Sequence, residues 1–165
     1  MSGLRSLIPI SRYINKKYCY FKMSNTNFFD NNNYRFNSKS RLGVLIIHGF
    51  TNTTFETKEL AQFLSKEGFH SLTKNLPGHG TTVEDCNRYK YTDWISFVEK
   101  ELAGLVSCSD KVFVIGISMG SVLAMHLCTI FPISAAVFGA PVLEFKDRFG
   151  TRILTPLLHK IVRTH

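Results

Sequence analysis

The residues with the clearest chemical potential are Gly116-Ile117-Ser118-Met119-Gly120, which match the pattern G-x-S-x-G. The hydroxyl of Ser118 could attack an ester carbonyl, but a serine is a weak nucleophile and needs an activating base. The attack also creates a negatively charged oxygen, which must be held by hydrogen-bond donors that are already in place. Chemistry at Ser118 would therefore require a base with its acid, and two suitably placed N–H groups.

The sequence on either side of Ser118 favours a nucleophilic role. Residues 111–118, KVFVIGIS, predict a buried strand, and residues 119–131 predict a helix that stops before Pro132. A serine between such a strand and helix lies on a strained turn that exposes its Oγ. Gly116 and Gly120 fit this turn, because a larger side chain at either position would crowd the neighbouring backbone. The competing interpretation is a tight turn with an incidental serine.

The elements that would position this turn alternate along the chain from Gly43 onward. Further strands are predicted at 43–49, 69–76 and 135–140, and helices at 55–68, 92–106 and 153–162. Alternating strands and helices predict an α/β fold with a parallel sheet of about four strands between helical layers. We expect little regular structure before Leu42.

Two of these helices carry specific signals. In the first, Leu60, Phe63 and Leu64 should share the buried face, and Gly68 should end the helix. In the second, Thr92 or Asp93 should be the N-cap. Its apolar residues recur at helical spacing and should face the core: Trp94, Phe97, Val98, Leu102 and Leu105.

The loops that follow the predicted strands indicate where a site would lie. In parallel sheets, sites form at the carboxyl ends of the strands, where Gly49-Phe50, residues 77–80 and Ser118 all fall. The N–H of Met119, the residue after the serine, is one expected oxyanion donor. The second donor must come from the loop after an earlier strand, and the N–H of Phe50 is the candidate.

Several motifs in order resemble the α/β-hydrolase superfamily: VLIIHGFTNTTFETKELAQFLSKEGF, LPGHGTT, DW, VFVIGISMGSVLAMHL and APV. More narrowly, they are similar to the microbial carboxylesterase and monoacylglycerol-lipase group, which is also filed with serine aminopeptidase S33-type hydrolases. The resemblance covers about residues 42–143. It implies a Ser-His-Asp triad, no metal or cofactor, a small cap after the sixth strand, and that the predicted strands are family strands three to six.

The resemblance also assigns roles at the site. Ser118 matches the nucleophile, and Phe50 and Met119 match the oxyanion-hole positions. His48 and Gly49 match the loop that supports the hole, and His79 matches the family's G-H-G loop near the site. We interpret His48 and His79 as structural rather than as bases, and His70, early in a predicted strand, likewise.

The triad partners are harder to find. In this superfamily the acid and the histidine follow the serine, and five residues are candidates: His126, Glu144, Asp147, His159 and His165. His126 lies eight residues into the helix, ~12 Å along its axis from Ser118, so we interpret it as a helix-face or core residue. Glu144 and Asp147 stay open as the acid, whereas His159 lies in cap-like sequence and His165 is the last residue. We therefore expect the chain to stop inside the cap and to show very low esterase activity.

Charge, hydropathy and cysteine content indicate which partners and which cellular compartment to expect. The net charge is +8, but residues 1–22 contribute five Lys and Arg and no acid, and no basic stripe interleaved with aromatics follows. We therefore expect no nucleic-acid partner, and no stable membrane insertion because no run of 18 apolar residues occurs. The scattered residues Cys19, Cys86, Cys108 and Cys128 predict free thiols in a reducing, cytoplasmic setting. A mitochondrial presequence in residues 1–22, or a true start at Met23, is the alternative.

The expected organisation has three parts: a poorly structured segment at 1–41, the N-terminal half of a hydrolase core at 42–143, and the start of a cap at 144–165. The expected function is hydrolysis of small apolar acyl esters, such as monoacylglycerols, through an acyl-enzyme on Ser118. The alternative function is a catalytically inactive binding module that reuses the hydrolase scaffold. A third possibility is completion of the site by a second chain.

Overall fold

A computed structural model describes residues 30–142 of the 165-residue chain. The predictions for the N-terminal segment up to residue 29 and for the helix at 153–162 lie outside the described residues. The same holds for the candidate triad residues Glu144, Asp147, His159 and His165.

Five strands form one mixed sheet in the order β1-β3-β2-β4-β5. Their bounds are β1 Tyr34–Phe36, β2 Leu42–Ile47, β3 His70–Thr73, β4 Lys111–Ile117 and β5 Ala135–Gly139. Strand β2 pairs in parallel with β3 and β4, and β4 pairs in parallel with β5. The parallel part of the sheet is the four-stranded arrangement that the sequence predicts.

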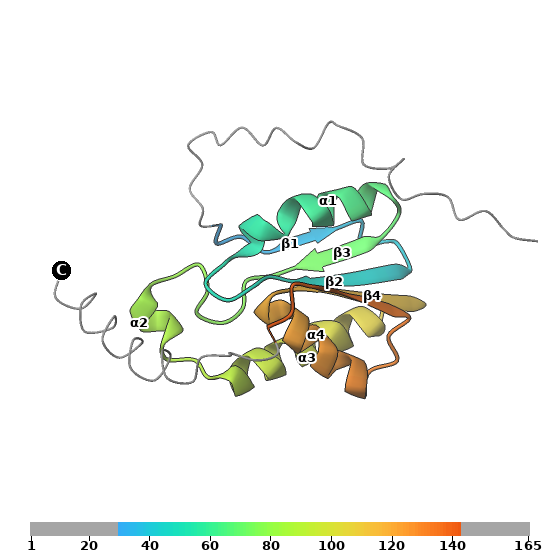
Figure 1. The fold of residues 1–165 in the computed structure, drawn as a ribbon. Helices are drawn as coiled ribbons and strands as arrows, with labels where there is room; N and C mark the ends of the chain where they lie inside the picture. Colours follow the sequence, from blue (N-terminus) through green and yellow to red (C-terminus); the bar gives the residue numbers. More distant parts are fainter. Residues whose placement is uncertain (1–29, 143–165) are drawn as a thin grey trace, which may run out of the picture.

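The helices lie in two layers on opposite faces of this sheet (Figure 1). A 3-10 turn, η3 (Thr54–Glu56), and helix α1 (Lys58–Lys66) follow β2, and α1 covers one face. Helices α3 (Tyr91–Val106) and α4 (Met119–Ile130) cover the other face, and the short α2 (Val83–Cys86) lies beyond the end of β3. The loops after β2, β3 and β4 therefore meet at one edge, as expected for parallel strands.

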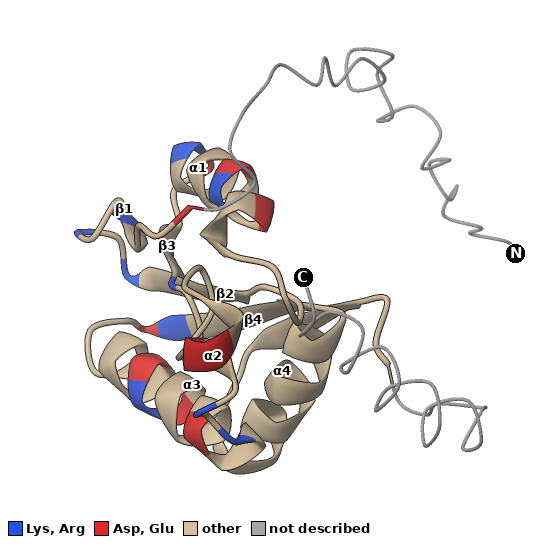
Figure 2. Cartoon of the chain, turned by 90° about the vertical axis from the view of Figure 1, so that its left-hand side faces the viewer, with Lys and Arg blue, Asp and Glu red and all other residues tan. Residues whose placement is uncertain are grey.

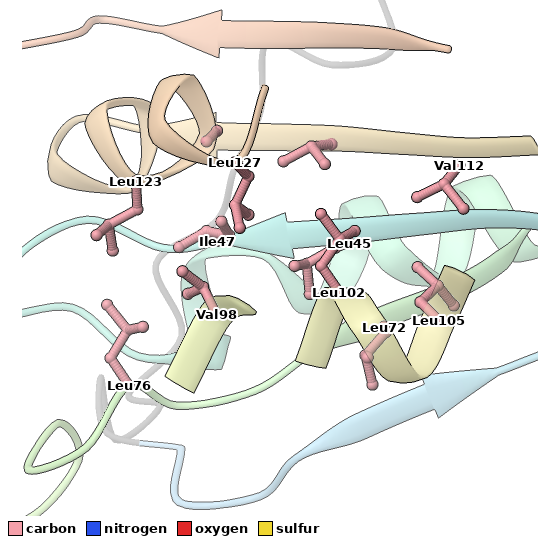
Figure 3. Close-up of a cluster of buried hydrophobic side chains, with 12 residues drawn as sticks. Leu45, Ile47, Leu72, Leu76, Val98, Leu102, Leu105, Val112, Leu123 and Leu127 are labelled. Carbon is pink, nitrogen blue, oxygen red and sulfur yellow. The ribbon is translucent and has the colours of Figure 1, made fainter. Parts of the chain in front are cut away.

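The core is divided by the sheet because alternate residues of a strand point to opposite faces. Val44 and Ile46 of β2 pack with Ala61 of α1. Leu45 and Ile47 point the other way, into the larger cluster between the sheet and helices α3 and α4 (Figure 3). This larger cluster confirms the predicted apolar face of α3 and contains Val98, Leu102, Leu105, Val114, Leu123, Ala124 and Leu127.

The prediction of little regular structure before Leu42 is wrong at β1. This strand pairs antiparallel with β3, in the register Tyr34↔Thr73 to Phe36↔Ser71. Its three residues carry too little alternation to be recognised in the sequence, and the strand exists because it covers an edge of β3. Lys58 also lies 4.6 Å from the centroid of the Tyr34 ring, which ties α1 to this edge.

Two other local predictions are corrected. Lys90 is the N-cap of α3, and Asp93 lies at its third position, where its carboxylate accepts the Lys90 N–H at 2.7 Å. The predicted helix at 55–68 is interrupted at Thr57, and Phe63 is half exposed whereas Leu60 and Leu64 pack on the core. Gly68 ends the segment as predicted, with a φ of 93° directly after the C-cap Glu67.

Charged residues of both signs alternate on α1 and α3 (Figure 2). Ion pairs join Lys74 to Glu101 at 2.9 Å, and Arg41 to Asp110. Among residues 30–142, no helix is long and apolar enough to span a membrane. Cys86, Cys108 and Cys128 are free thiols, and Cys19 lies outside the described residues.

Among the described residues, strand β5 lies at one edge of the sheet and carries exposed apolar side chains. Val137 is 58% exposed, Phe138 is also exposed, and so is Val142, which follows the strand. We expect Val137→Lys to reduce self-association, because a lysine on an edge strand opposes pairing with another strand. Since Val137 is mostly exposed, the free energy of unfolding should change by less than about 0.5 kcal/mol.

Light scattering during incubation at increasing protein concentration measures this effect. Val122→Lys is the matched control, because Val122 is exposed on α4 rather than on the sheet edge. Equal suppression of scattering by both variants would show that added charge, and not the β5 edge, is responsible.

Candidate active site

Ser118 occupies the predicted turn between β4 and α4. Its φ of 53° and ψ of −117° are unusual for a residue with a side chain, and it is the N-cap of α4. Its N–H donates to the carbonyl of Gly139 at the end of β5, at 2.8 Å. Such a strained conformation persists only when the surrounding structure imposes it, and it is typical of functional sites.

The two glycines of the motif are needed for close backbone approach. A side-chain carbon at Gly116 would collide with the carbonyl of Gly120 and lie 2.6 Å from the Cα of Ser121. A side-chain carbon at Gly120 would collide with the carbonyl of Ile47 and lie 2.6 Å from that of His48. Helix α4 therefore starts directly against the end of β2, and this contact brings the β2 loop to Ser118.

Two backbone N–H groups beside Ser118 are free to act as donors. Neither Phe50 N–H nor Met119 N–H donates a hydrogen bond within residues 30–142. A side-chain carbon at Gly49, the neighbour of Phe50, would lie 3.2 Å from the Cβ of Ser118. The structure thus brings together the three residues that the sequence predicts for the nucleophile and the oxyanion hole.

His48 is completely buried and both of its ring nitrogens are used. Its Nε2 accepts the Leu76 N–H at 3.0 Å, so the proton is on Nδ1, which donates to the Gly49 carbonyl at 2.9 Å. Burial lowers the pKa of His48 from 6.5 to about 4, because the charged ring would be desolvated. His48 is therefore a neutral link between the β2 loop and the β3 loop, which supports the structural interpretation.

His79 lies in a cluster of rings beside the loop that follows β2. Its ring centroid is 5.1 Å from that of His48, 5.7 Å from Phe50 and 5.3 Å from Trp94. Trp94 is fixed in turn by donation from its Nε1 to the Pro77 carbonyl at 2.9 Å. Burial lowers the pKa of His79, so its ring is held neutral, and the loop at 77–80 packs against Phe50.

A cavity of about 380 Å³ opens between the β2 loop and α2. It is lined by Phe50 and Thr51 after β2, by Gly78, His79 and Gly80, and by residues of the α2 segment that include Val83 and Cys86. Ser118 does not line this cavity, whereas Phe50, the neighbour of Gly49, does. None of its lining residues among the described part of the chain is charged.

The histidine that follows Ser118 on α4 is confirmed as a helix-face residue. His126 Nε2 lies 2.7 Å from Glu99 Oε1 of α3, and this pair joins the two helices. Within residues 30–142, Ser118 Oγ makes no hydrogen bond to a histidine. The described residues thus include the candidate nucleophile Ser118 and the two candidate donors, and none of the described histidines bonds Ser118 Oγ as a base would.

Three residues that hold the candidate site in shape were not predicted from the sequence. Glu56 accepts the Gly49 N–H at 2.8 Å, and Trp94 contacts both Phe50 and His79. Ser121 is completely buried and its Oγ lies 2.8 and 2.9 Å from the carbonyls of Gly116 and Gly139. Glu56 and Trp94 depend on loops brought together by the fold, and no spacing in the sequence would have indicated either of them.

Comparison with known proteins agrees with this geometry. The family model described as serine aminopeptidase, S33 matches residues 38–165. The thermostable monoacylglycerol lipase of Bacillus sp. (strain H-257) is 39% identical over 103 residues, which are 58% of this chain and 41% of that protein. The carboxylesterase of Bacillus subtilis (strain 168) is 28% identical over 95 residues, which are 57% of this chain and 39% of that protein.

Solved structures show the same fold. A metagenome-derived lipolytic enzyme from the study of LipS and LipT superimposes with a TM-score of 0.68 at 27% identity, over 72% of this chain and 49% of its own. The Paleococcus ferrophilus monoacylglycerol lipase superimposes with a TM-score of 0.57 at 19% identity, over 79% and 52%. The chain spans about two-fifths of the curated relatives that it matches and about half of these structures.

Proposed function

Because this chain belongs to the serine aminopeptidase S33 family of α/β-hydrolases, we propose that Ser118 is the nucleophile of a carboxylic ester hydrolase of monoacylglycerol-lipase or esterase type. The observation that carries the proposal is the geometry of Ser118. Ser118 is half-buried in a strained turn between β4 and α4, beside a loop whose Phe50 N–H donates to no acceptor among the described residues.

The reaction would proceed in two steps. Ser118 Oγ attacks the ester carbonyl while its proton passes to a base that the described residues do not supply, and the N–H groups of Phe50 and Met119 hold the oxyanion. The C–O bond to the alcohol then breaks, the alcohol leaves with that proton, and an acyl-enzyme remains on Ser118. Water then releases the acid by the reverse sequence. The first turn of α4 adds a favourable field at the oxyanion, because the helix dipole places partial positive charge at its N-terminus.

The cavity favours an uncharged substrate. An aminopeptidase has to accommodate the free ammonium group of its substrate. When this charged group is buried, it needs an opposite charge or hydrogen-bond acceptors around it. The described lining of the cavity has no charged side chain, whereas Phe50, Val83 and Cys86 offer apolar contact. These features support an acyl ester over a free peptide amino terminus.

The test is active-site labelling of the full chain with a fluorophosphonate probe, together with hydrolysis of p-nitrophenyl butyrate. Ser118→Ala should abolish labelling, because no other serine occupies the strained turn. Ser96→Ala, an exposed serine on α3, is the matched control and should label like the wild type. Probe incorporation that survives Ser118→Ala would refute the proposal.

A further inference from the structure

Glu56 places a carboxylate next to the candidate nucleophile. Its Oε2 accepts the Gly49 N–H at 2.8 Å and would lie 3.6 Å from a side-chain carbon at Gly49. Since the same position is 3.2 Å from the Cβ of Ser118, Glu56 Oε2 is at most about 7 Å from that carbon. The carboxylate therefore belongs to the immediate surroundings of the site.

The bond from Glu56 fixes one of two consecutive peptide groups. Glu56 holds the N–H of Gly49, whereas the carbonyl of Gly49 accepts from His48 Nδ1 at 2.9 Å and from the Asn52 N–H at 3.2 Å. Because a peptide group is planar, the direction of the Gly49 carbonyl sets the direction of the Phe50 N–H. Because the peptide groups on both sides of Gly49 are hydrogen-bonded, the backbone at Gly49 has little freedom to rotate. These bonds therefore fix the direction of the Phe50 N–H, the proposed oxyanion donor.

The loop needs such a clamp because it contains strain. Thr51, directly after Phe50, has a φ of 62°, which is rare for a β-branched residue. A residue in this region costs about 1–3 kcal/mol and stays there only when its surroundings hold it. If the bond from Glu56 were lost, Thr51 could relax and carry the Phe50 N–H away from its present direction.

The turn that carries Glu56 is itself firmly held. Thr54 is completely buried, its N–H donates to Asn75 at 2.8 Å, and its hydroxyl donates to the Asn32 carbonyl at 2.8 Å. Thr57 is also completely buried, and its hydroxyl lies 2.6 Å from that of Thr73 on β3. Glu56 thus lies between two anchored threonines, so the backbone that carries its carboxylate is fixed, and the bond to the Gly49 N–H orients the carboxylate itself.

We propose that Glu56 is a positioning residue for the oxyanion hole, acting on the Phe50 N–H through the peptide groups of Gly49. The proposal rests on the function proposed above for Ser118. Glu56 neither attacks the substrate nor exchanges a proton with it. Its effect should fall on the rate of acylation and not on binding, because a misdirected donor weakens the transition state selectively.

The experiment compares Glu56→Ala and Glu56→Gln in the full chain, with Glu59→Ala on the exposed side of α1 as the matched control. Fluorophosphonate labelling at several probe concentrations separates the maximal rate from the probe's apparent affinity. Glu56→Ala should lower the maximal rate roughly 10- to 100-fold, within the range for a lost or displaced donor. Glu56→Gln should stay within roughly threefold of the wild type, since its amide oxygen can accept the same N–H.

Amide resonances of Gly49 and Phe50 give a second reading that does not depend on activity. Both should shift in Glu56→Ala and stay near their wild-type positions in Glu56→Gln and Glu59→Ala. A folded Glu56→Ala that labels at the wild-type rate would overturn the proposal. If Ser118 in the wild type does not react with the probe at all, the proposed function fails. The role of Glu56 is then decided by the chemical shift of the Phe50 amide alone. An unmoved Phe50 amide in Glu56→Ala would then reject it.

Discussion

Replacing Gly116 with alanine is expected to lower the free energy of unfolding by more than about 3 kcal/mol. The new carbon would collide with the backbone of Gly120 and lie 2.6 Å from the Cα of Ser121, and neither group can rotate away as a side chain could. Relief would require α4 to move from β4. Urea unfolding followed by the fluorescence of Trp94, the single tryptophan, measures the change.

Gly104→Ala is the matched control for this substitution. Gly104 lies within α3, and a carbon there would meet nothing within 4 Å. Because alanine favours a helix over glycine, this variant should gain about 0.5–1 kcal/mol. If Gly116→Ala were as stable as the wild type, the tight contact between β4 and α4 would not exist in solution.

Acidification from pH 7 to pH 4 is expected to remove about 3 kcal/mol of stability through His48 alone. Burial lowers its pKa from 6.5 to about 4, so between these values the unfolded chain binds a proton that the folded chain does not. Stability is therefore fully present above pH 6.5 and falls as the pH falls toward 4. Protonation would also remove the acceptor that Nε2 offers to the Leu76 N–H.

Comparison with His48→Asn isolates this contribution. Urea unfolding of both proteins at intervals between pH 7 and pH 4 gives two curves, and the carboxylates and other histidines titrate in each. The wild type should lose about 3 kcal/mol more than the variant over this range. Parallel curves would show that His48 does not change its protonation on folding, and the neutral link between the two loops would have to be abandoned.

Most of the fold could be predicted because the parallel strands are marked by composition. Strands β2 and β4 are apolar on both faces, since helices cover both sides of the sheet, and such runs stand out in a sequence. Strand β1 could not be predicted in this way. Its three residues are held by pairing with β3, a contact across more than 30 residues of chain. The apolar residues at helical spacing located α3. The identity of its N-cap, Lys90, depended on the path of the loop between α2 and α3.

The candidate site likewise contains residues that a local motif predicts and residues that only the fold brings together. The positions of Ser118, Met119 and the two motif glycines could be predicted because the turn between β4 and α4 is local and is formed by five consecutive residues. Phe50 could be placed because strand ends of a parallel sheet share an edge. The role of Glu56 and the ring contacts of Trp94 could not, since they arise between segments that no sequence spacing relates.

By itself, then, the sequence determined the α/β-hydrolase lineage, the strained turn at Ser118 and the layers of the sheet. The turn and the layers depend on local residue pattern and on periodicity, whereas the lineage depends on the resemblance of several motifs in order to that superfamily. Only the tertiary structure decided how the loop after β2 is held. His48 and Glu56 bond the two consecutive peptide groups of Gly49, and these side chains meet their partners only when β2, β3 and the turn before α1 are packed together.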